Sequence, residues 1–409
     1  MPEQPSINVA LLTGGGDKPY AFGYAHAFIE AGCGFEFLGS NELESPFLKE
    51  NPLVVFRNIR GDQSEDAALS RKIVRILRYY GRLLKYAVTA KPKVFHILWN
   101  NKFEWFDRTI LMLFYRLCGR RIVFTAHNVN IRERDGNDSF LNRFTLRIQY
   151  ALASAIFVHT ERMGVDLREK FGVSPTKIKV IPFPINSTPP TTDLSGSQAR
   201  LKLGVGPDEK VLLVYGQIAP YKGIDYLLES LAHLKEQGIK CRLLIAGRVK
   251  KGAEAYWDSL QQSIRKLCLD EAVLERVEFI PDEETEIYFK AADALVLPYR
   301  SIFQSGVLFL SYNYGLPVLV SDLGSLQECV VQGETGFVFR ATDVQDLSSV
   351  IRRYFESPLY RDLQKRRLKI RNFAIENYSW NRVMSVSLQV YSGLLGVEEE
   401  QLITQRSLQ

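Results

Sequence analysis

Short apolar runs alternate with helix-length amphipathic segments along both halves of this 409-residue chain. The runs are rich in Val, Ile, Leu and Phe, as strands buried on both faces of a sheet are. Strands that alternate with helices predict βαβ units, in which a parallel sheet is covered by helices on both faces. The expected strands are INVALLTGG, FEFLG, LVVFRNI, VFHILW, RIVFTAHN and AIFVHT in the first half, and KVLLVYG, CRLLIAG, VEFI, ALVLPY, PVLVSD and GFVFR in the second.

Residues 181–200 interrupt this alternation. The segment IPFPINSTPPTTDLSGSQAR is rich in Pro, Ser and Thr, which is typical of a linker. We therefore expect an α/β protein with two Rossmann-like, doubly wound domains that face each other across a cleft and close on ligands. The expected boundaries are an N-terminal domain over 1–185, a linker over 186–200, a C-terminal domain over 201–376, and a C-terminal helix and tail over 377–409.

The cysteines and the N-terminus indicate where such a chain works. The five cysteines are scattered and never form a CxxC pair, which argues against a disulfide framework or a structural zinc site and favours a reducing compartment. The N-terminal sequence reads as a first strand rather than a signal peptide, and no apolar run is long enough to span a bilayer. We expect a cytoplasmic protein.

Basic residues are concentrated in the first half of the chain. Residues 1–190 carry 26 Lys and Arg against 18 Asp and Glu, and residues 71–93 carry eight basic residues and no acidic one. Helix-spaced apolar residues between them predict a basic amphipathic helix, which suits an anionic membrane surface or a polyanionic acceptor. The protein would then be peripheral on the inner face of the membrane. The alternative is a surface helix whose apolar stripe packs on its own domain. We expect no nucleic-acid partner.

Two segments of the second half have the pattern of an anion site. In 211–231 a strand ends at Tyr215, and a loop that contains Lys222 leads into a helix near Ile224. In 293–330 a strand leads through Gln304-Ser305-Gly306 into a helix from Val307. Helix N-termini present backbone N–H groups to anions, small residues allow a phosphate close approach, and a lysine can neutralise a diphosphate. Taken alone, each segment is more often an ordinary strand–helix turn.

The order of these motifs resembles a known family. YGQIAPYKG, LLIAG, VEFI-P, ADALVLPY, SGV, YGLPVLVSDLGSLQE and GETGFVF are similar to the C-terminal domain of family 4 glycosyltransferases over residues 205–355. The glycine loop, TAHN and SAIFVHTE extend the resemblance loosely to the first half. The resemblance implies the GT-B fold and transfer of a sugar from a nucleotide-diphosphate sugar to a saccharide or lipid-linked acceptor. It also implies retention of anomeric configuration, in polysaccharide or glycoconjugate biosynthesis.

The resemblance also implies roles for particular residues. Lys222 matches the lysine that binds the donor diphosphate, and Ser305, Gly306 and Val307 match the loop whose amides hold the distal phosphate. Ile280, with Pro281, matches backbone that reads the nucleobase. Gly14, Gly15 and Gly16 match a glycine loop that closes over donor and acceptor, and His127 matches a histidine near the transferred sugar. His96 and Trp99 end another strand and either line the acceptor pocket or pack in the core.

The chain departs from the family pattern at the donor site. The family arginine is absent, with Gln217 or Ala219 in its place, and both carboxylates of the family's E-x7-E pair are absent, since Ile302 and Leu310 stand there. A variant with a QSG loop that dispenses with the pair is the form we expect. Arg248, which follows the IAG strand, is our candidate for the missing positive charge.

The chemistry expected is metal-free. No DxD pair stands in a suitable loop, so we predict no essential metal and no cofactor besides the nucleotide sugar. Charge that develops on the leaving diphosphate would be stabilised by Lys222 and by backbone N–H groups. The resemblance implies a front-face route with retention, because no protein nucleophile is evident. The alternatives are a non-catalytic GT-B partner or carbohydrate-binding protein and, more remotely, an epimerase or phosphorylase on the same fold.

Overall fold

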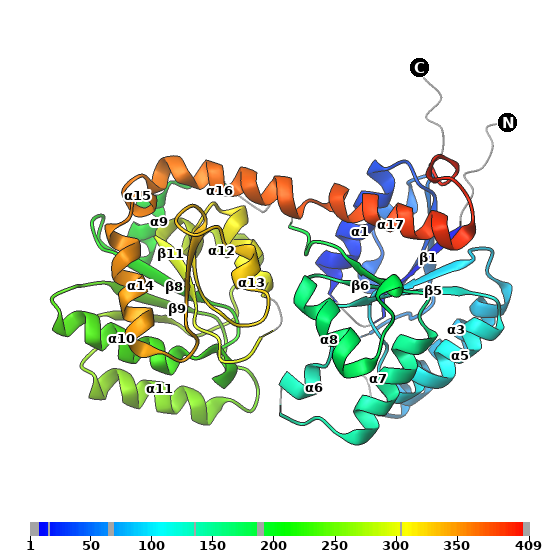
Figure 1. Ribbon diagram of the computed structural model, residues 1–409, viewed down its shortest axis with the longest axis horizontal. Helices are drawn as coiled ribbons and strands as arrows, with labels where there is room; N and C mark the ends of the chain where they lie inside the picture. Colours follow the sequence, from blue (N-terminus) through cyan, green and yellow to red (C-terminus); the bar gives the residue numbers. More distant parts are fainter. Residues whose placement is uncertain are drawn as a thin grey trace, which may run out of the picture. The chain divides into compact units, whose positions relative to one another are not determined.

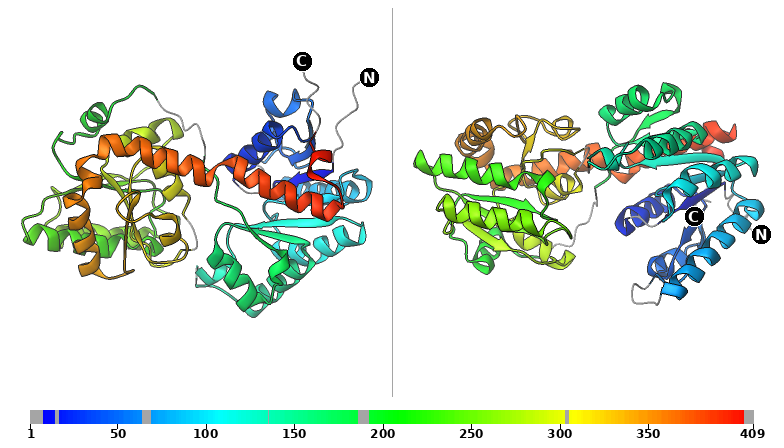
Figure 2. Two further views of the ribbon diagram at one scale, coloured as in Figure 1. Left: turned by 45° about the horizontal axis from the view of Figure 1, so that its top comes forward. Right: turned by 90° about the horizontal axis from the view of Figure 1, so that it is seen from below.

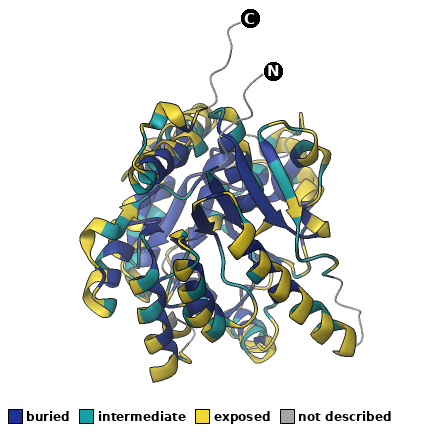
Figure 3. Cartoon of the chain, turned by 90° about the vertical axis from the view of Figure 1, so that its right-hand side faces the viewer, coloured by how far each residue is buried: buried dark blue, intermediate teal, exposed yellow. Residues whose placement is uncertain are grey.

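The computed structural model describes residues 8–14, 17–63, 69–134, 136–185, 192–302 and 305–403. The chain divides into two compact units, one of residues Met1–Pro184 with Trp380–Gln409 and one of residues Ile185–Ser379 (Figure 1). Each unit is a parallel sheet with helices on both faces (Figure 2). The central strands of each sheet are buried, whereas the edge strands are partly exposed and the outward sides of the helices are exposed (Figure 3). The expected α/β, doubly wound architecture is confirmed.

The first sheet has seven parallel strands in the order β3-β2-β1-β4-β5-β6-β7. Its helices α1 and α17 lie on one face, and α3, α5 and α7 lie on the other (Figure 1). The strands are β1 Val9–Leu12, β2 Phe35–Gly39, β3 Val54–Asn58, β4 Val94–Ile97, β5 Arg121–Ala126, β6 Ala155–Val158 and β7 Ile178–Val180. The helical segments are α1 Lys18–Glu30, η1 Asn41–Leu43, α2 Pro46–Lys49, α3 Leu69–Thr89, α4 Glu104–Phe106, η2 Asp107–Leu111, α5 Met112–Leu117, α6 Ile131–Arg134, α7 Phe140–Leu152, α8 Glu161–Phe171, η3 Pro175–Lys177, α17 Trp380–Leu395 and η6 Glu399–Gln401.

The second sheet has six parallel strands in the order β10-β9-β8-β11-β12-β13. Helix α10 packs against α11 and α14, while α9 packs against α12, and α13 against α16. The strands are β8 Val211–Tyr215, β9 Arg242–Ala246, β10 Val273–Arg276, β11 Ala294–Leu297, β12 Val318–Ser321 and β13 Gly336–Phe339. The helical segments are α9 Gly196–Leu203, η4 Pro220–Lys222, α10 Ile224–Glu236, α11 Glu254–Lys266, α12 Asp282–Ala291, α13 Gly306–Asn313, η5 Gln327–Cys329, α14 Val344–Glu356, α15 Pro358–Arg361 and α16 Leu363–Tyr378.

Each sheet has one point at which the strand order reverses. In the first, β1 lies beside β4 although the chain visits β2 and β3 between them, and in the second β8 lies beside β11. At such a point the loops that follow the two central strands leave toward opposite faces, which opens a crevice at the carboxyl edge of the sheet. The ligand-binding loops of each unit are therefore expected after β1 and β4, and after β8 and β11.

Three sequence-based expectations about segments differ from the structure. The third strand of the second sheet is VLER over Val273–Arg276, not VEFI, and the short strand β7 was not expected. Residues 192–200 of the expected linker belong to the second unit, where Thr192 donates from its backbone N and Oγ1 to the Glu286 carboxylate at 2.9 and 2.6 Å. Residues 186–191 lie outside the described residues.

The C-terminal helix and tail, which we predicted over 377–409, belong to the first unit from Trp380 onward. Val383, Met384, Leu388 and Tyr391 of α17 enter the same apolar core as Tyr24 and Phe28 of α1. Gly23 allows this approach, since a Cβ atom there would lie 2.1 Å from the Trp380 ring. Of the residues described, no helix combines the length and apolar character that crossing a membrane requires.

Substitution of Gly23 tests this packing. Gly23→Ala should lower the free energy of unfolding by about 1–3 kcal/mol, because the added methyl group displaces Trp380. Gly81, in the middle of α3, is the matched control, because no atom lies within 4 Å of the position that a Cβ atom would take there. Gly81→Ala should raise stability by about 0.5–1 kcal/mol, since alanine is the better helix former. Urea unfolding of both variants measures the two effects, and equal effects would contradict the docking of α17 on α1.

Candidate functional site

Lys222 lies at the carboxyl edge of β8 and is almost completely buried, at 4% exposure. Its Nζ donates to the Tyr215 backbone oxygen at 2.7 Å and lies 5.7 Å from the centre of the Tyr299 ring. No ion pair joins Lys222 to a carboxylate among the residues described here. Burial lowers the pKa of Lys222 to about 8. The ammonium group is thus desolvated and uncompensated, a state that favours an anionic ligand.

A glycine places this lysine beside the loop that follows β11. A Cβ atom at Gly216, whose φ is +92°, would lie 3.2 Å from Lys222 Nζ and 3.6 Å from Val307 Cγ2. The same point is therefore close to the lysine and to the first turn of α13. The backbone of Gly247, directly after β9, lies against the backbone of Gly216, since a Cβ atom at Gly247 would lie 2.2 Å from the Gly216 oxygen. The structure thus brings together Lys222 and Val307, which the sequence predicted as parts of one site.

Helix α13 presents its N-terminus at this edge. Ser305 is the N-cap residue, but its Oγ hydrogen-bonds to the Tyr299 hydroxyl at 3.0 Å instead of capping the helix. The first N–H groups of a helix have no partner within the helix and carry partial positive charge. Gly306 and Val307 therefore supply donors suited to phosphate oxygens. Gln304 of the QSG loop lies outside the described residues.

The other predicted donor residues follow neighbouring strands at the same edge. Gln217 is exposed after β8, and Ile280 is buried directly before α12, of which Pro281 is the N-cap. Arg248 is exposed after β9, and its guanidinium lies 5.8 Å from the centre of the Phe279 ring. Arg248 thus stands where a second cation could reach the crevice, and its role stays a prediction. Ile302 and Leu310, at the positions of the absent carboxylates, are half-buried.

Sequence reasoning missed two tyrosines in this site. Tyr299 holds Ser305 and lies under Lys222, and the Tyr221 ring stacks on Tyr299 with centroids 6.0 Å apart. Lys250 in turn lies 5.7 Å from the centre of the Tyr221 ring. The available signal was position, because Tyr299 lies two residues after the end of the buried strand β11 and Tyr221 directly precedes the lysine.

The carboxyl edge of the first sheet carries an aromatic and histidine cluster. The rings of Trp99, after β4, and His127, after β5, stack with centroids 4.3 Å apart and an interplanar angle of 7°. Tyr20 of α1 lies edge-on to both, with centroids 5.3 and 4.7 Å away. His127 Nδ1 and His159 Nε2 are 3.2 Å apart and share a hydrogen bond. The structure thus joins Trp99 and His127 and adds Tyr20 and His159, which sequence reasoning missed.

The histidines of this cluster are neutral at physiological pH. Burial lowers the pKa of His159 to about 4, and burial together with His159 holds the pKa of His127 well below its usual range. A neutral imidazole can donate or accept a hydrogen bond with a sugar hydroxyl, but it does not supply positive charge.

The loop after β1 touches the loop after β4. Gly14 has a φ of +57°, and a Cβ atom there would lie 2.2 Å from the Trp99 backbone oxygen. Only glycine fits this approach. Gly15 and Gly16, which we predicted to contact donor and acceptor, lie outside the described residues.

The His96 side chain is not accessible to an acceptor. The residue is completely buried, and its Nδ1 and Nε2 atoms lie 2.6 Å from Tyr391 Oη and 2.7 Å from Thr125 Oγ1. Both ring nitrogens are thus engaged, and burial lowers the pKa of His96 to about 3. Of the two roles that the sequence left open, the structure supports core packing and not the predicted acceptor contact.

Two doubly wound units, each with a candidate ligand site at the carboxyl edge of its sheet, form the architecture of the GT-B glycosyltransferases. Comparison with known proteins agrees. The sequence model "Glycosyl transferases group 1" matches residues 197–376, and the model "Glycosyltransferase Family 4" matches residues 15–188. The chain belongs to family 4 of the glycosyltransferases, enzymes that transfer a sugar from a nucleotide sugar.

Relatives cover nearly the whole chain. D-inositol 3-phosphate glycosyltransferase from Rhodococcus erythropolis is 23% identical over 92% of this chain and 86% of its own length. Among solved structures, sucrose-phosphate synthase from Thermosynechococcus elongatus has a TM-score of 0.74 and 18% identity over 95% of this chain and 99% of its own. Anabaena HepE in complex with UDP has a TM-score of 0.70 and 16% identity over 96% and 100%. These structures share the fold.

The depressed pKa of Lys222 predicts how nucleotide affinity depends on pH. A diphosphate favours the ammonium form, which dominates below about pH 8. Affinity should therefore be constant up to about pH 8 and fall above it, by up to about tenfold per pH unit. Calorimetry with a nucleoside diphosphate between about pH 7 and 9 measures this dependence. Lys222→Ala should bind more weakly and without the fall, whereas a constant affinity of the unaltered protein would contradict the assignment.

Proposed function

We propose that the second unit binds a nucleoside diphosphate sugar with its diphosphate on Lys222 Nζ and the N–H groups of Gly306 and Val307. The observation that carries this proposal is the buried, carboxylate-free Lys222 beside the N-terminus of α13, at the point where the strand order reverses. Positive charge and helix N–H groups that converge on one point form a site for a dianionic group. The UDP complex of HepE makes UDP the first nucleotide to test.

The proposed reaction breaks the bond between the anomeric carbon and the diphosphate. Negative charge grows on the leaving phosphate, and Lys222 and the two N–H groups stabilise it in a site with little water. The proposal includes retention by a front-face route, in which the leaving phosphate takes the acceptor proton, and it includes no essential metal. Sugar transfer that continues at full rate in EDTA would support the absence of an essential metal.

We assign acceptor binding to the first unit. The Trp99–His127 stack gives a sugar ring an aromatic wall, as apolar sugar faces require. The neutral His127 would hydrogen-bond a hydroxyl of the transferred sugar or of the acceptor. The cluster has no charged side chain among Tyr20, Trp99, His127 and His159, so it suits an uncharged saccharide.

A nucleotide panel tests the donor site. Calorimetry against UDP, GDP, ADP, TDP and CMP should show saturable binding of one diphosphate. Lys222→Ala should weaken that binding and lower kcat by about 10²–10³-fold, the usual effect of losing one charge-stabilising donor. Lys235→Ala, at the far end of α10, is the control and should change neither. Binding without turnover of any nucleotide sugar would favour a non-catalytic GT-B protein.

We also propose that the acceptor is presented at an anionic membrane surface. The first half of α3 extends beyond the core, since Ile73, Val74 and Leu77 are exposed, Leu77 to 66%. This exposure argues against the alternative in which the whole apolar stripe packs on its own domain, whereas the second half of α3 does pack through Tyr80, Leu83, Tyr86 and Ala87.

The beginnings of two further helices extend this surface. Crossover helices of a parallel sheet begin at its carboxyl edge, so the first turns of α3, α4 and α7 share that edge. Exposed apolar side chains stand there on α4 and α7 as well, namely Phe103, Trp105, Phe140 and Leu141. Exposed basic side chains include Arg71, Arg78, Lys102 and Arg132. Aromatic and basic residues together are typical of proteins that bind the membrane interface.

Vesicle binding tests this surface. The protein should sediment with phosphatidylglycerol vesicles and not with phosphatidylcholine vesicles, and salt should weaken binding because it screens headgroup charge. Arg71→Gln with Arg78→Gln should weaken binding about 30-fold, on the basis of about 1 kcal/mol for each basic residue. The control is Lys266→Gln at the end of α11 in the second unit. Binding that is equal for both lipids would contradict the proposal.

A further inference from the structure

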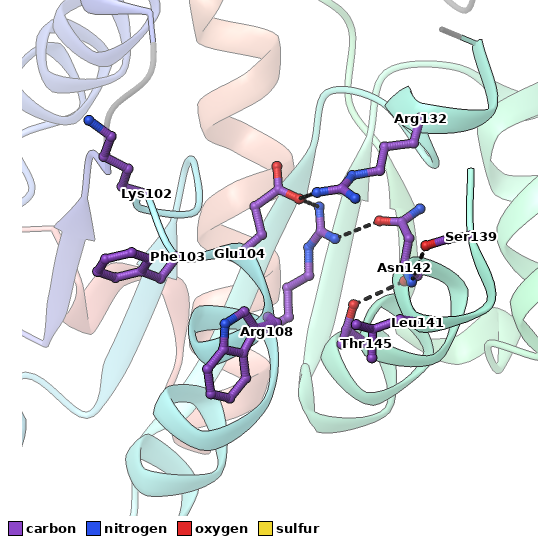
Figure 4. A pocket seen from close by; sticks show the side chains of 10 residues that line it. Lys102, Phe103, Glu104, Arg108, Arg132, Ser139, Leu141, Asn142 and Thr145 are labelled. Atoms are coloured by element: carbon purple, nitrogen blue, oxygen red, sulfur yellow. Dashed lines mark hydrogen bonds and ion pairs between the residues drawn. The ribbon is translucent and has the colours of Figure 1, made fainter. Parts of the chain in front are cut away.

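A pocket of about 350 Å³ lies in the first unit, away from the Trp99–His127 stack. One wall comes from the chain that follows β4, with Phe103, Glu104, Trp105 and Arg108, and the other from α6 and the start of α7 (Figure 4). Both walls begin at the carboxyl ends of β4 and β5, the same edge that carries Trp99 and His127. The volume is in the range of small-ligand sites.

Two arginines share one carboxylate in this pocket. The guanidinium groups of Arg108 and Arg132 each lie 3.1 Å from Glu104 Oε2, as Figure 4 shows. One carboxylate neutralises only one of the two positive charges. Arg132 is nearly half-exposed, whereas Arg108 is buried at 6% exposure, so part of this positive charge is removed from water, and Asp107 also interacts electrostatically with Arg108.

Arg108 also has an unused donor. Its Nη1 donates to Asn142 Oδ1 at 2.8 Å and its Nη2 is paired with Glu104, but its Nε has no hydrogen-bond partner among the described residues. A buried guanidinium N–H without an acceptor costs free energy, because it loses its hydrogen bond to water. Arg108 also lies in the π-helical segment η2, a local geometry that is frequent at functional sites.

We propose that this pocket binds a phosphate ester of the acceptor through Arg108 and Arg132, with the exposed Trp105 at its rim. A phosphate carries enough negative charge and enough acceptor oxygens to bind two guanidinium groups. The single Glu104 carboxylate does not fully satisfy Arg108 and Arg132. The proposal rests on the assignment of the acceptor to the first unit. It adds that the acceptor carries a phosphate, either on a soluble sugar or in a lipid headgroup.

A purely structural role for Arg108 makes a different prediction. If Arg108 only ties η2 to α7 through Asn142, its substitution lowers stability, and changes at Arg132 or Glu104 leave phosphate binding unaffected. If the pocket binds phosphate, Glu104 competes with the ligand for both arginines. The two roles therefore predict different outcomes for removal of the Glu104 charge, namely unchanged phosphate binding for a structural role and stronger binding for a phosphate site.

The experiment measures binding of glycerol 3-phosphate to the full chain by calorimetry. Arg132→Gln and Arg108→Lys should each weaken binding by about tenfold, since each loses a charge-assisted hydrogen bond. Glu104→Gln should strengthen binding, by up to about tenfold, because it releases both arginines. Arg143→Gln, an exposed arginine of α7 paired with Asp138, is the matched control and should leave binding unchanged. Thermal unfolding of each variant separates lost binding from lost folding.

Two further measurements distinguish a soluble phosphate from a lipid-borne one and separate this pocket from the candidate donor site at Lys222. Vesicles with phosphatidic acid, compared with phosphatidylcholine, report on a lipid-borne phosphate. Dependence on Arg132 in only one of the two phosphate arms identifies the source. In Lys222→Ala the phosphate should still bind, so failure of the donor site and failure of this pocket are separable. The proposal is overturned if neither phosphate binds, if binding is unchanged in Arg132→Gln and Glu104→Gln, or if Lys222→Ala abolishes it.

Discussion

Close backbone contact at the carboxyl ends of the central strands is the constraint on which both sites depend. In the second unit the chain after β8 must pass the end of β9, and in the first unit the chain after β1 must pass the end of β4. A side chain at Gly247 or Gly14 would overlap backbone atoms, and one at Gly216 would crowd Lys222 Nζ at 3.2 Å. These contacts fix the loops that carry Lys222 in one sheet and adjoin Trp99 in the other. The point of strand reversal thus sets where ligands bind, and the glycines set how close the loops come.

The candidate donor site is charged, whereas the aromatic cluster around Trp99 and His127 is not. The candidate donor site holds a buried lysine and a helix N-terminus, with Lys250 beside Tyr221 and Arg248 as a predicted further cation, whereas burial keeps the histidines beside Trp99 neutral. Charge in the first unit is found instead in the Arg108–Arg132 pocket and on α3. A diphosphate therefore has one favourable place, and an uncharged sugar ring has another. The absent family arginine and glutamates are compatible with this arrangement, because the diphosphate contacts proposed here use Lys222 and backbone N–H groups.

The sequence predicted the local pattern well and the tertiary partners poorly. Runs such as 211–215 and 294–297 are buried on both faces, so their composition alone marks them as strands, and Lys222 and Val307 follow from position after those strands. The apolar residues of VEFI predict a strand there, but the strand of the structure is the more polar VLER. VLER is the edge strand β10, which pairs with one neighbour only and is therefore less buried. His96 lies in an apolar strand, and this sequence context is the same whether its ring packs in the core or contacts an acceptor. Its partner Tyr391 is 295 residues away, and no local pattern shows that contact.

The place of the C-terminal helix in the fold could not be predicted from the sequence either. This helix supports the aromatic cluster of the first unit. Periodicity predicts a helix after residue 377 but does not say which core it completes. Trp380 packs against Gly23, and its ring lies 5.1 Å from that of Tyr20, which in turn contacts His127. Tyr391 of the same helix holds His96 and stacks on Phe28. The last helix of the chain therefore supports both the core of the first unit and the aromatic cluster at its carboxyl edge. Residues 1–184 alone lack the helix whose apolar face covers α1 and packs against Tyr20, so the aromatic cluster proposed to bind the acceptor needs both ends of the chain.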